Sequence, residues 1–157
     1  MNKVIKQRMT VTMKKPFVVF LIGMRFNVWW KLHKWLPVVL AMPRMLKELS
    51  RQKSDGLLSY EMWFGRTTLM VQYWDSFESL EKYAKAKERA HLPAWQAFNQ
   101  KVGSGGDVGI WHETYQVSPD AYESIYNNMP KFGLGRAGVL VEASGDRNRA
   151  EGRLKNP

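Results

Sequence analysis

Four segments of the chain are rich in β-branched, aromatic and aliphatic residues and predict strands. They are residues 17–27 (FVVFLIGMRFN), 57–64 (LLSYEMWF), 67–74 (TTLMVQYW) and 107–117 (DVGIWHETYQV). Their β-branched, aromatic and aliphatic side chains are typical of strands that are buried on both faces of a sheet. Gly65-Arg66 separates the second segment from the third, which indicates a tight hairpin.

Two further segments repeat apolar residues every three or four positions and predict helices. The first covers residues 29–52 and contains two prolines that bend or split it. The second begins after Asp75-Ser76, where either side chain can accept a hydrogen bond from the first turn. It continues past a bend at Pro93 to Asn99.

The resulting order, β-α-β-β-α-β, predicts an α+β fold with a ferredoxin-like sheet over residues 16–143. Both helices would cover one face of the sheet. The other face is too apolar to face water, and a second copy of the chain is its simplest cover, so we expect a homodimer. After the last core strand, Ser118-Pro119 predicts a short C-terminal helix, and residues 137–142 predict an edge strand.

The two ends of the chain are rich in cations. Residues 1–15 predict a basic arm or edge strand, and residues 144–157 predict a disordered basic tail. The formal charge of +10 therefore comes largely from tails, and because no nucleic-acid-binding motif is present, we expect no specific nucleic-acid partner.

The absence of Cys and the hydropathy of the chain indicate where in the cell the protein is located. The chain has no Cys, which fits a cytoplasmic protein. The apolar run that begins at Phe17 is shorter than the roughly 20 residues of a spanning helix and contains Arg25. A cluster of Trp29, Trp30 and Trp35 leaves peripheral membrane contact as an open alternative.

His91, Trp95 and Asn99 form an i, i+4, i+8 row on the second predicted helix. The row places an imidazole, an aromatic wall and an amide beside an apolar pocket. His91 can then act as a catalytic base that removes a proton from a carbon acid, whose carbanion passes an electron to dioxygen. The alternative is that His91 bonds a backbone carbonyl near Pro93 and only packs.

A second group of polar residues lies on the predicted strands. Arg25 and Asn27, with Gln72 and Trp74, are candidates to bind a carboxylate or carbonyl of a substrate. They can equally form a buried network that sets strand register.

His112 is a further candidate for substrate binding. It shares a strand face with Thr114, whereas Glu113 faces the other way with Trp111 and Tyr115. The sequence leaves open which face lines the pocket, and an interface hydrogen bond is the alternative role for His112.

Three His and no Cys, far apart in the sequence, predict no metal site. We expect no bound cofactor. Haem needs a single axial His, so a haem cofactor bound by His91 or His33 is the alternative.

Several motifs resemble a known family. VVFLIGMRFNVWWKLHKWLPV, QYWDSFESLEKYA, AHLPAWQAFN, GDVGIWHETY and NMPKFGLGRAG are similar to a domain-of-unknown-function family related to a polyketide-modifying monooxygenase of the fumagillin pathway. The resemblance covers residues 8–143 and places the chain near the dimeric α+β barrel superfamily, with the antibiotic-biosynthesis monooxygenases. It implies two sheets packed face to face across a dimer, and a pocket between each sheet and its own helices.

The resemblance and the residues together predict a small homodimeric monooxygenase-like enzyme that acts on an apolar, aromatic or polyketide-like molecule. The superfamily also contains haem-dependent aldoxime dehydratases and non-catalytic stress proteins. A haem-dependent enzyme and a non-catalytic dimer that binds a ligand or haem therefore remain the alternatives.

Overall fold

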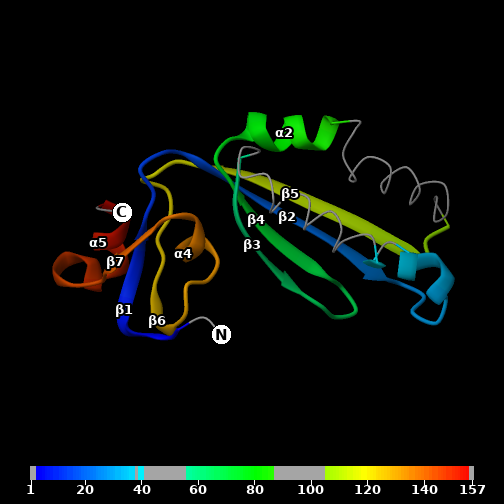
Figure 1. Cartoon of the computed structure of the whole chain (residues 1–157), viewed down its shortest axis with the longest axis horizontal. Helices are drawn as coiled ribbons and strands as arrows, with labels where there is room; N and C mark the ends of the chain where they lie inside the picture. Colours follow the sequence, from blue (N-terminus) through cyan, green and yellow to red (C-terminus); the bar gives the residue numbers. More distant parts are fainter. Residues whose placement is uncertain (1–2, 38, 41–55, 87–104, 156–157) are drawn as a thin grey trace.

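A long four-stranded antiparallel sheet dominates the computed structural model, and a smaller three-stranded sheet adjoins it at one end (Figure 1). The structure describes residues 3–37, 39–40, 56–86 and 105–155. The larger sheet has the strand order β3-β4-β2-β5, which confirms the ferredoxin-like prediction and its hairpin. Its strands are β2 (Phe17–Phe26), β3 (Leu57–Trp63), β4 (Leu69–Trp74) and β5 (Val108–Val117).

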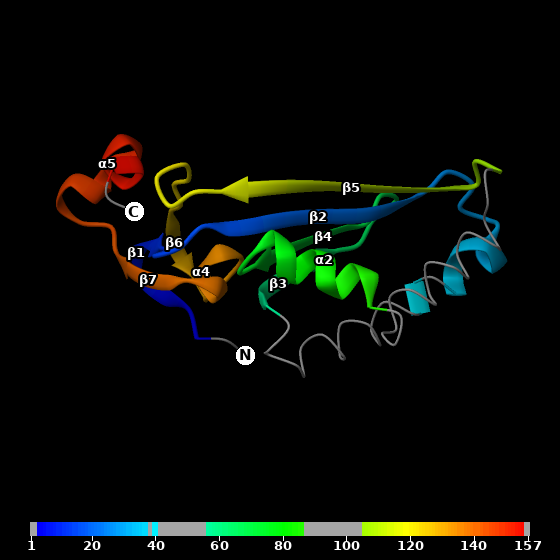
Figure 2. The same cartoon turned by 90° about the horizontal axis from the view of Figure 1, so that it is seen from above.

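Side chains of the larger sheet alternate between two faces, and we call the one covered by helices the helix face. α2 (Phe77–Lys85) packs on one end of this face, where its Leu80 joins Val18 and Trp74 in a buried cluster. Residues 32–37 are helical and cover the other end, where Trp35 packs beside Met24. Figure 2 shows both helical segments on the same side of the sheet.

The start of α2 follows from its capping residue. Ser76 has extended backbone angles, and its hydroxyl accepts a hydrogen bond from the Ser79 amide at 3.1 Å. The predicted N-terminus is therefore confirmed. α2 is described to Lys85, and the predicted continuation to Asn99 lies outside the described residues, as do residues 41–52 of the first predicted helix.

The opposite side of the larger sheet, the outer face, is covered by described residues at one end and along β3, where Phe132 packs on Trp63 and Gly133 bonds Ser59 and Glu61. At the covered end, Phe17 packs with Val11 of the smaller sheet and with Leu134 of α4 (Leu134–Ala137). Gly23 lies farther along this face, and a Cβ atom there would collide with the Thr68 carbonyl oxygen. The rest of the outer face carries residues that are half-buried or exposed: Leu21, Val71, Trp111, Glu113 and Tyr115.

The N-terminal segment is not an arm or an edge strand, which corrects the sequence prediction. β1 (Ile5–Thr12) is the middle strand of the smaller sheet, between β6 (Tyr126–Met129) and β7 (Val139–Glu142). The weak alternation of polar and apolar residues in β1 does not indicate a middle strand. Thr10 and Val11 are nevertheless both buried, on opposite faces. The predicted C-terminal edge strand is confirmed as β7.

The helix predicted after Ser118-Pro119 is absent from the described structure. A turn joins the Ala121 amide to the Ser118 carbonyl, and the chain then stays extended. The Tyr122 hydroxyl accepts a hydrogen bond from the Met13 amide at 2.7 Å and donates one to the Val11 carbonyl at 3.1 Å. These two bonds hold the segment against β1 in an extended conformation.

The tail after residue 144 is ordered as far as Lys155, which also corrects the prediction. η2 (Gly145–Asn148) and α5 (Ala150–Lys155) enclose the guanidinium group of Arg153. Arg153 donates to Glu123 at 2.7 Å and to the carbonyls of Arg147 and Asn148 at 2.9 and 3.1 Å. A cationic residue thus anchors the tail by filling a polar site.

In the described ranges, no helix is long and apolar enough to span a membrane.

We predict that Tyr122→Phe lowers the free energy of unfolding by about 1–3 kcal/mol, because it leaves the Met13 amide and the Val11 carbonyl without their shared partner. Urea denaturation measures the change. Tyr60→Phe is the control, since the Tyr60 hydroxyl bonds no group in the described structure, and an equal loss in both variants would contradict the prediction.

We predict that Arg153→Met detaches η2 and α5 without unfolding the larger sheet. The methionine fills similar space but satisfies neither Glu123 nor the two carbonyls. Amide hydrogen exchange of residues 145–155 should rise by at least tenfold, whereas exchange in β2 and β4 should not change. Protection of the tail equal to that of the unmodified chain would contradict this role for Arg153.

Candidate functional site

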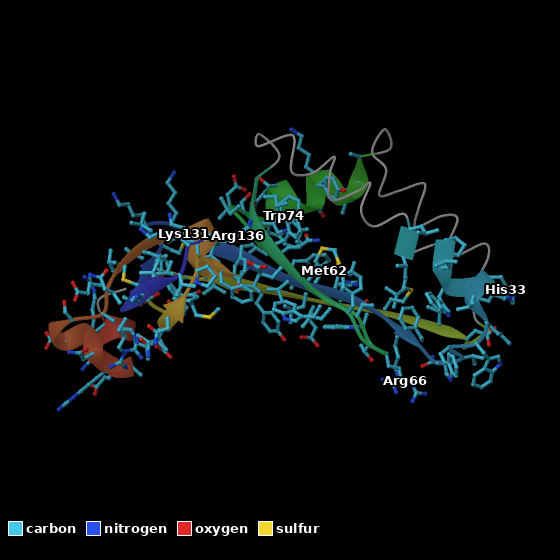
Figure 3. The ribbon with its side chains drawn as sticks, turned by 60° about the horizontal axis from the view of Figure 1, so that its bottom comes forward. His33, Met62, Arg66, Trp74, Lys131 and Arg136 are labelled. Atoms are coloured by element: carbon cyan, nitrogen blue, oxygen red, sulfur yellow. The ribbon has the colours of Figure 1, made fainter. Side chains whose placement is uncertain are left out.

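The middle of the helix face, between α2 and residues 32–37, combines apolar side chains with a few polar ones. Strand register brings them together, because Phe20 lies opposite Gln72 and Thr114, and Ile22 lies opposite Met70 and His112. Met62 of β3 pairs with Met70, and Figure 3 shows it in relation to Trp74. We call this set the central surface: Phe20, Ile22, Met62, Met70, Gln72, His112 and Thr114.

Gln72 and Trp74 bind each other on this face. The Trp74 indole N–H donates to Gln72 Oε1 at 2.9 Å, and Gln72 Nε2 contacts the Met70 sulfur at 3.0 Å. Trp74 is fully buried and packs on Tyr83 of α2 with ring centroids 5.7 Å apart. Trp74 is therefore core. The Gln72 carboxamide carries a second N–H donor, but Gln72 is buried, with 9% of its surface exposed.

His112 lies on the helix face, because it pairs with Ile22 of β2. Its ring is exposed and packs against Phe20 with centroids 5.8 Å apart. Thr114 shares the face, as predicted. Of the two described histidines, His112 belongs to the central surface, whereas His33 is exposed at the far end of the molecule (Figure 3).

Arg25 and Asn27 do not join Gln72 and Trp74, contrary to the sequence prediction. Arg25 belongs to the outer face and donates to the Thr67 hydroxyl at 2.8 Å. Asn27 follows β2 and donates to the Gly106 carbonyl at 2.9 Å. Gln72 and Trp74 of β4 lie on the helix face beside even-numbered residues of β2, whereas Arg25 lies on the outer face, so the four side chains do not converge on one substrate group. Arg25 and Asn27 are both exposed, so these two bonds do not form the buried network that was the alternative.

His91, Trp95 and Asn99 lie outside the described residues, so their predicted row stays a prediction. Glu113, on the outer face, accepts a hydrogen bond from the Tyr115 hydroxyl at 2.6 Å. This bond raises the pKa of Tyr115. The two residues therefore share a face, as predicted, and point away from the central surface.

Sequence reasoning missed a polar cluster around Gly133, which docks α4 on β3. Gly133 has a positive φ of 53°, its amide donates to Glu61 at 3.0 Å, and its carbonyl accepts from the Ser59 hydroxyl at 3.0 Å. Burial raises the pKa of Tyr73 and of Tyr126 beside it, so both hydroxyls stay protonated at neutral pH. The paired glycines of GLGRAG were the signal, because a glycine at positive φ marks a specific backbone contact.

No three His, Asp or Glu residues of the described chain come close enough together to hold a metal ion. The polar groups of the central surface are an imidazole, a carboxamide and a hydroxyl, surrounded by apolar side chains. Such a surface is suited to orient an apolar molecule through a few hydrogen bonds.

Comparisons with known proteins extend this picture. Residues 17–134 match the family described as monooxygenase af470-like. The monooxygenase af470 of Aspergillus fumigatus is 35% identical over 115 residues, which cover 69% of this chain and 38% of the relative. The chain thus spans well under half of the length of that curated relative.

Two solved structures share the fold. A crystal structure of an aldoxime dehydratase in complex with butyraldoxime matches with a TM-score of 0.71 and 15% identity, over 88% of this chain and 44% of the other. A second aldoxime dehydratase matches with a TM-score of 0.67 and 16% identity over the same shares. At these identities the likeness establishes the fold only. By the match over residues 17–134 and the identity to the Aspergillus protein, the chain belongs to the monooxygenase af470-like family.

Proposed function

We propose that the chain is a small monooxygenase that binds an apolar, aromatic or polyketide-like molecule on the central surface. The observation that carries this proposal is the family match, in which the relative is named a monooxygenase. The composition of the central surface supports it, because apolar side chains surround only three polar ones. A polar or charged substrate would leave its own groups without partners there.

The proposed reaction oxidises a methylene group that is made acidic by a neighbouring carbonyl. A base removes one proton, and the carbanion passes electrons to dioxygen. One oxygen atom enters the carbon as a new carbonyl, and the other leaves as water with the two hydrogens of the methylene. The substrate supplies all four electrons, so the balance requires only dioxygen as the oxidant.

We assign the base to His91, which heads the predicted row with Trp95 and Asn99. An imidazole is suited to this role because its unperturbed pKa lies near neutrality. His112 and the Gln72 carboxamide would then bind the substrate carbonyl, whose oxygen gains negative charge as the proton leaves.

We predict that His91→Ala lowers the rate of oxidation by a factor of about 10² to 10⁴, because general-base catalysis contributes on that order. Oxygen uptake with anthrone, an aromatic carbon acid, measures the rate after subtraction of the uncatalysed reaction. His112→Ala should mainly raise KM, since we assign it to binding.

His33→Ala is the matched control, because His33 is exposed and far from the central surface. Equal losses in the His33 and His91 variants would contradict the assignment of the base. A chain that binds anthrone without any oxygen uptake would favour the non-catalytic alternative.

Haem remains the competing cofactor hypothesis. Of the two histidines considered as axial ligands, His33 is exposed at the far end of the molecule and does not face the central surface. It therefore does not fit a haem site there. A Soret band that appears on haem addition and disappears in His91→Ala would favour a haem-dependent enzyme over our proposal.

We further propose that the chain works as a cytoplasmic homodimer that pairs the outer faces of two larger sheets. Half-buried Leu21 and Val71 lie on this face, and Tyr115 leaves half of its surface exposed. Apolar side chains in the centre of an uncovered sheet are typical of an interface. A two-fold axis would bring the same face of both copies together.

We predict that Tyr115→Asp converts the dimer to a monomer, because the new carboxylate would be buried without a partner at the interface. Sedimentation velocity measures the mass. Thr114→Asp is the control, since Thr114 is the exposed neighbour on the helix face. A monomeric wild-type chain, or dissociation in both variants, would refute the outer-face dimer.

A further inference from the structure

One end of the larger sheet presents aromatic side chains to solvent from two separate turns. Trp29 and Trp30 follow β2 and are 63% and 66% exposed, and Phe64 in the β3–β4 turn is 70% exposed. The turns are neighbours, because the Phe26 amide donates to the Arg66 carbonyl at 2.9 Å. We call Trp29, Trp30 and Phe64 the aromatic tip.

The tip is held in place by the fold. The amides of Asn27 and Val28 both donate to the Asp107 carbonyl at 3.1 Å, and Lys31 pairs with the Asp107 carboxylate at 2.8 Å. The two indoles of Trp29 and Trp30 meet edge to face, 6.1 Å apart. The large side chains are therefore presented in a defined geometry, and little entropy is lost when they bind.

Trp35 does not belong to this tip, although the sequence grouped it with Trp29 and Trp30. Its ring packs on Phe26 with centroids 4.6 Å apart, and its indole N–H donates to the Trp29 carbonyl at 2.9 Å. Trp35 thus supports the loop from within. The exposed partner in its place is Phe64, which is distant in sequence.

Positive charge surrounds the tip. Arg25 and Arg66 are exposed at the same turns, and Figure 3 shows Arg66 and His33 at this end of the molecule. In the described residues of this end, Asp107 is the one carboxylate, and Lys31 neutralises it. Side chains that combine aromatic and cationic character at a tip match the interfacial region of an anionic bilayer.

We propose that the aromatic tip docks the protein on the surface of an anionic membrane. Trp and Phe would enter the headgroup region, while Arg25 and Arg66 meet lipid phosphates. Side chains that protrude from two turns suit a fluid bilayer, which accepts them at any spacing, whereas a protein partner requires a complementary surface. The proposal rests on exposure and charge and does not depend on the proposed monooxygenase activity.

Flotation of the full chain with vesicles tests the proposal. Vesicles of phosphatidylcholine with 30% phosphatidylserine should bind the protein in 0.1 M salt, and vesicles of phosphatidylcholine alone should bind it at least tenfold more weakly. Trp29→Ser combined with Trp30→Ser should weaken binding to the anionic vesicles by at least tenfold. Val139→Ser is the control, because Val139 is 59% exposed on β7 in the smaller sheet.

Arg66→Gln and Lys131→Gln form a matched pair for the charge. Each removes one exposed cation, but Figure 3 places Lys131 far from Arg66. Arg66→Gln should weaken binding about fivefold, the value expected for about 1 kcal/mol per cation near an anionic surface, and Lys131→Gln should not.

Three outcomes would overturn the proposal. One is no binding to anionic vesicles, and another is equal weakening in the Arg66 and Lys131 variants, which would mean that net charge alone drives adsorption. The third is a shift of the wild-type dimer to monomer in the Trp29 and Trp30 variant without loss of vesicle binding, which would assign the tip to contacts between copies.

Discussion

The pairing of β2 along both of its edges is the constraint on which the rest of the structure depends. Its hydrogen bonds to β4 and β5 place it second from one edge of the larger sheet, and every side chain must then go to one face or the other. Even-numbered residues such as Val18 and Met24 lie on the helix face, where they pack against α2 and residues 32–37. Odd-numbered residues supply the outer face. Because both sets are largely apolar, the strand cannot leave either face to water without a cost in free energy.

The same alternation separates the roles of the polar residues. His112 and Gln72 reach the helix face, and an apolar surface with few hydrogen-bonding groups results. Glu113 and Arg25 are one residue out of phase with His112 and Met24, and they take part in bonds on the outer face and at its end. The proposed chemistry, which joins an imidazole to an apolar ligand, would therefore use the helix face. The proposed contact between copies would use the outer face.

The smaller sheet and the Gly133 cluster show how the C-terminal third supports the larger sheet. Tyr122 binds the backbone of β1, Glu61 binds the Gly133 amide, and Arg153 closes the tail against Glu123. Each contact satisfies a backbone or charged group that would otherwise be buried unpaired. At the opposite end of the larger sheet the pattern reverses, because the two turns there leave large aromatic side chains in solvent. One end of the molecule is thus held together by polar bonds, and the other exposes large aromatic side chains.

The local pattern of the sequence was sufficient for the four core strands, the β3–β4 hairpin and the start of α2 after Asp75-Ser76, because composition, turn signals and capping act within a few residues. The order of these elements then predicted the ferredoxin-like sheet. The local pattern was not sufficient where a distant contact decided the outcome. Residues 118–126 have helix-start signals, yet side-chain bonds from Tyr122 and Ser124 to β1 hold them extended. The sequence alone assigns Arg153 to a basic tail, whereas the structure pairs it with Glu123. The sequence grouped Arg25 with Gln72 wrongly. The spacing of residues within one strand does not show which residues of a neighbouring strand lie on the same face of the sheet. Only tertiary structure decided these points, since each depends on groups that are far apart in the chain and meet after folding.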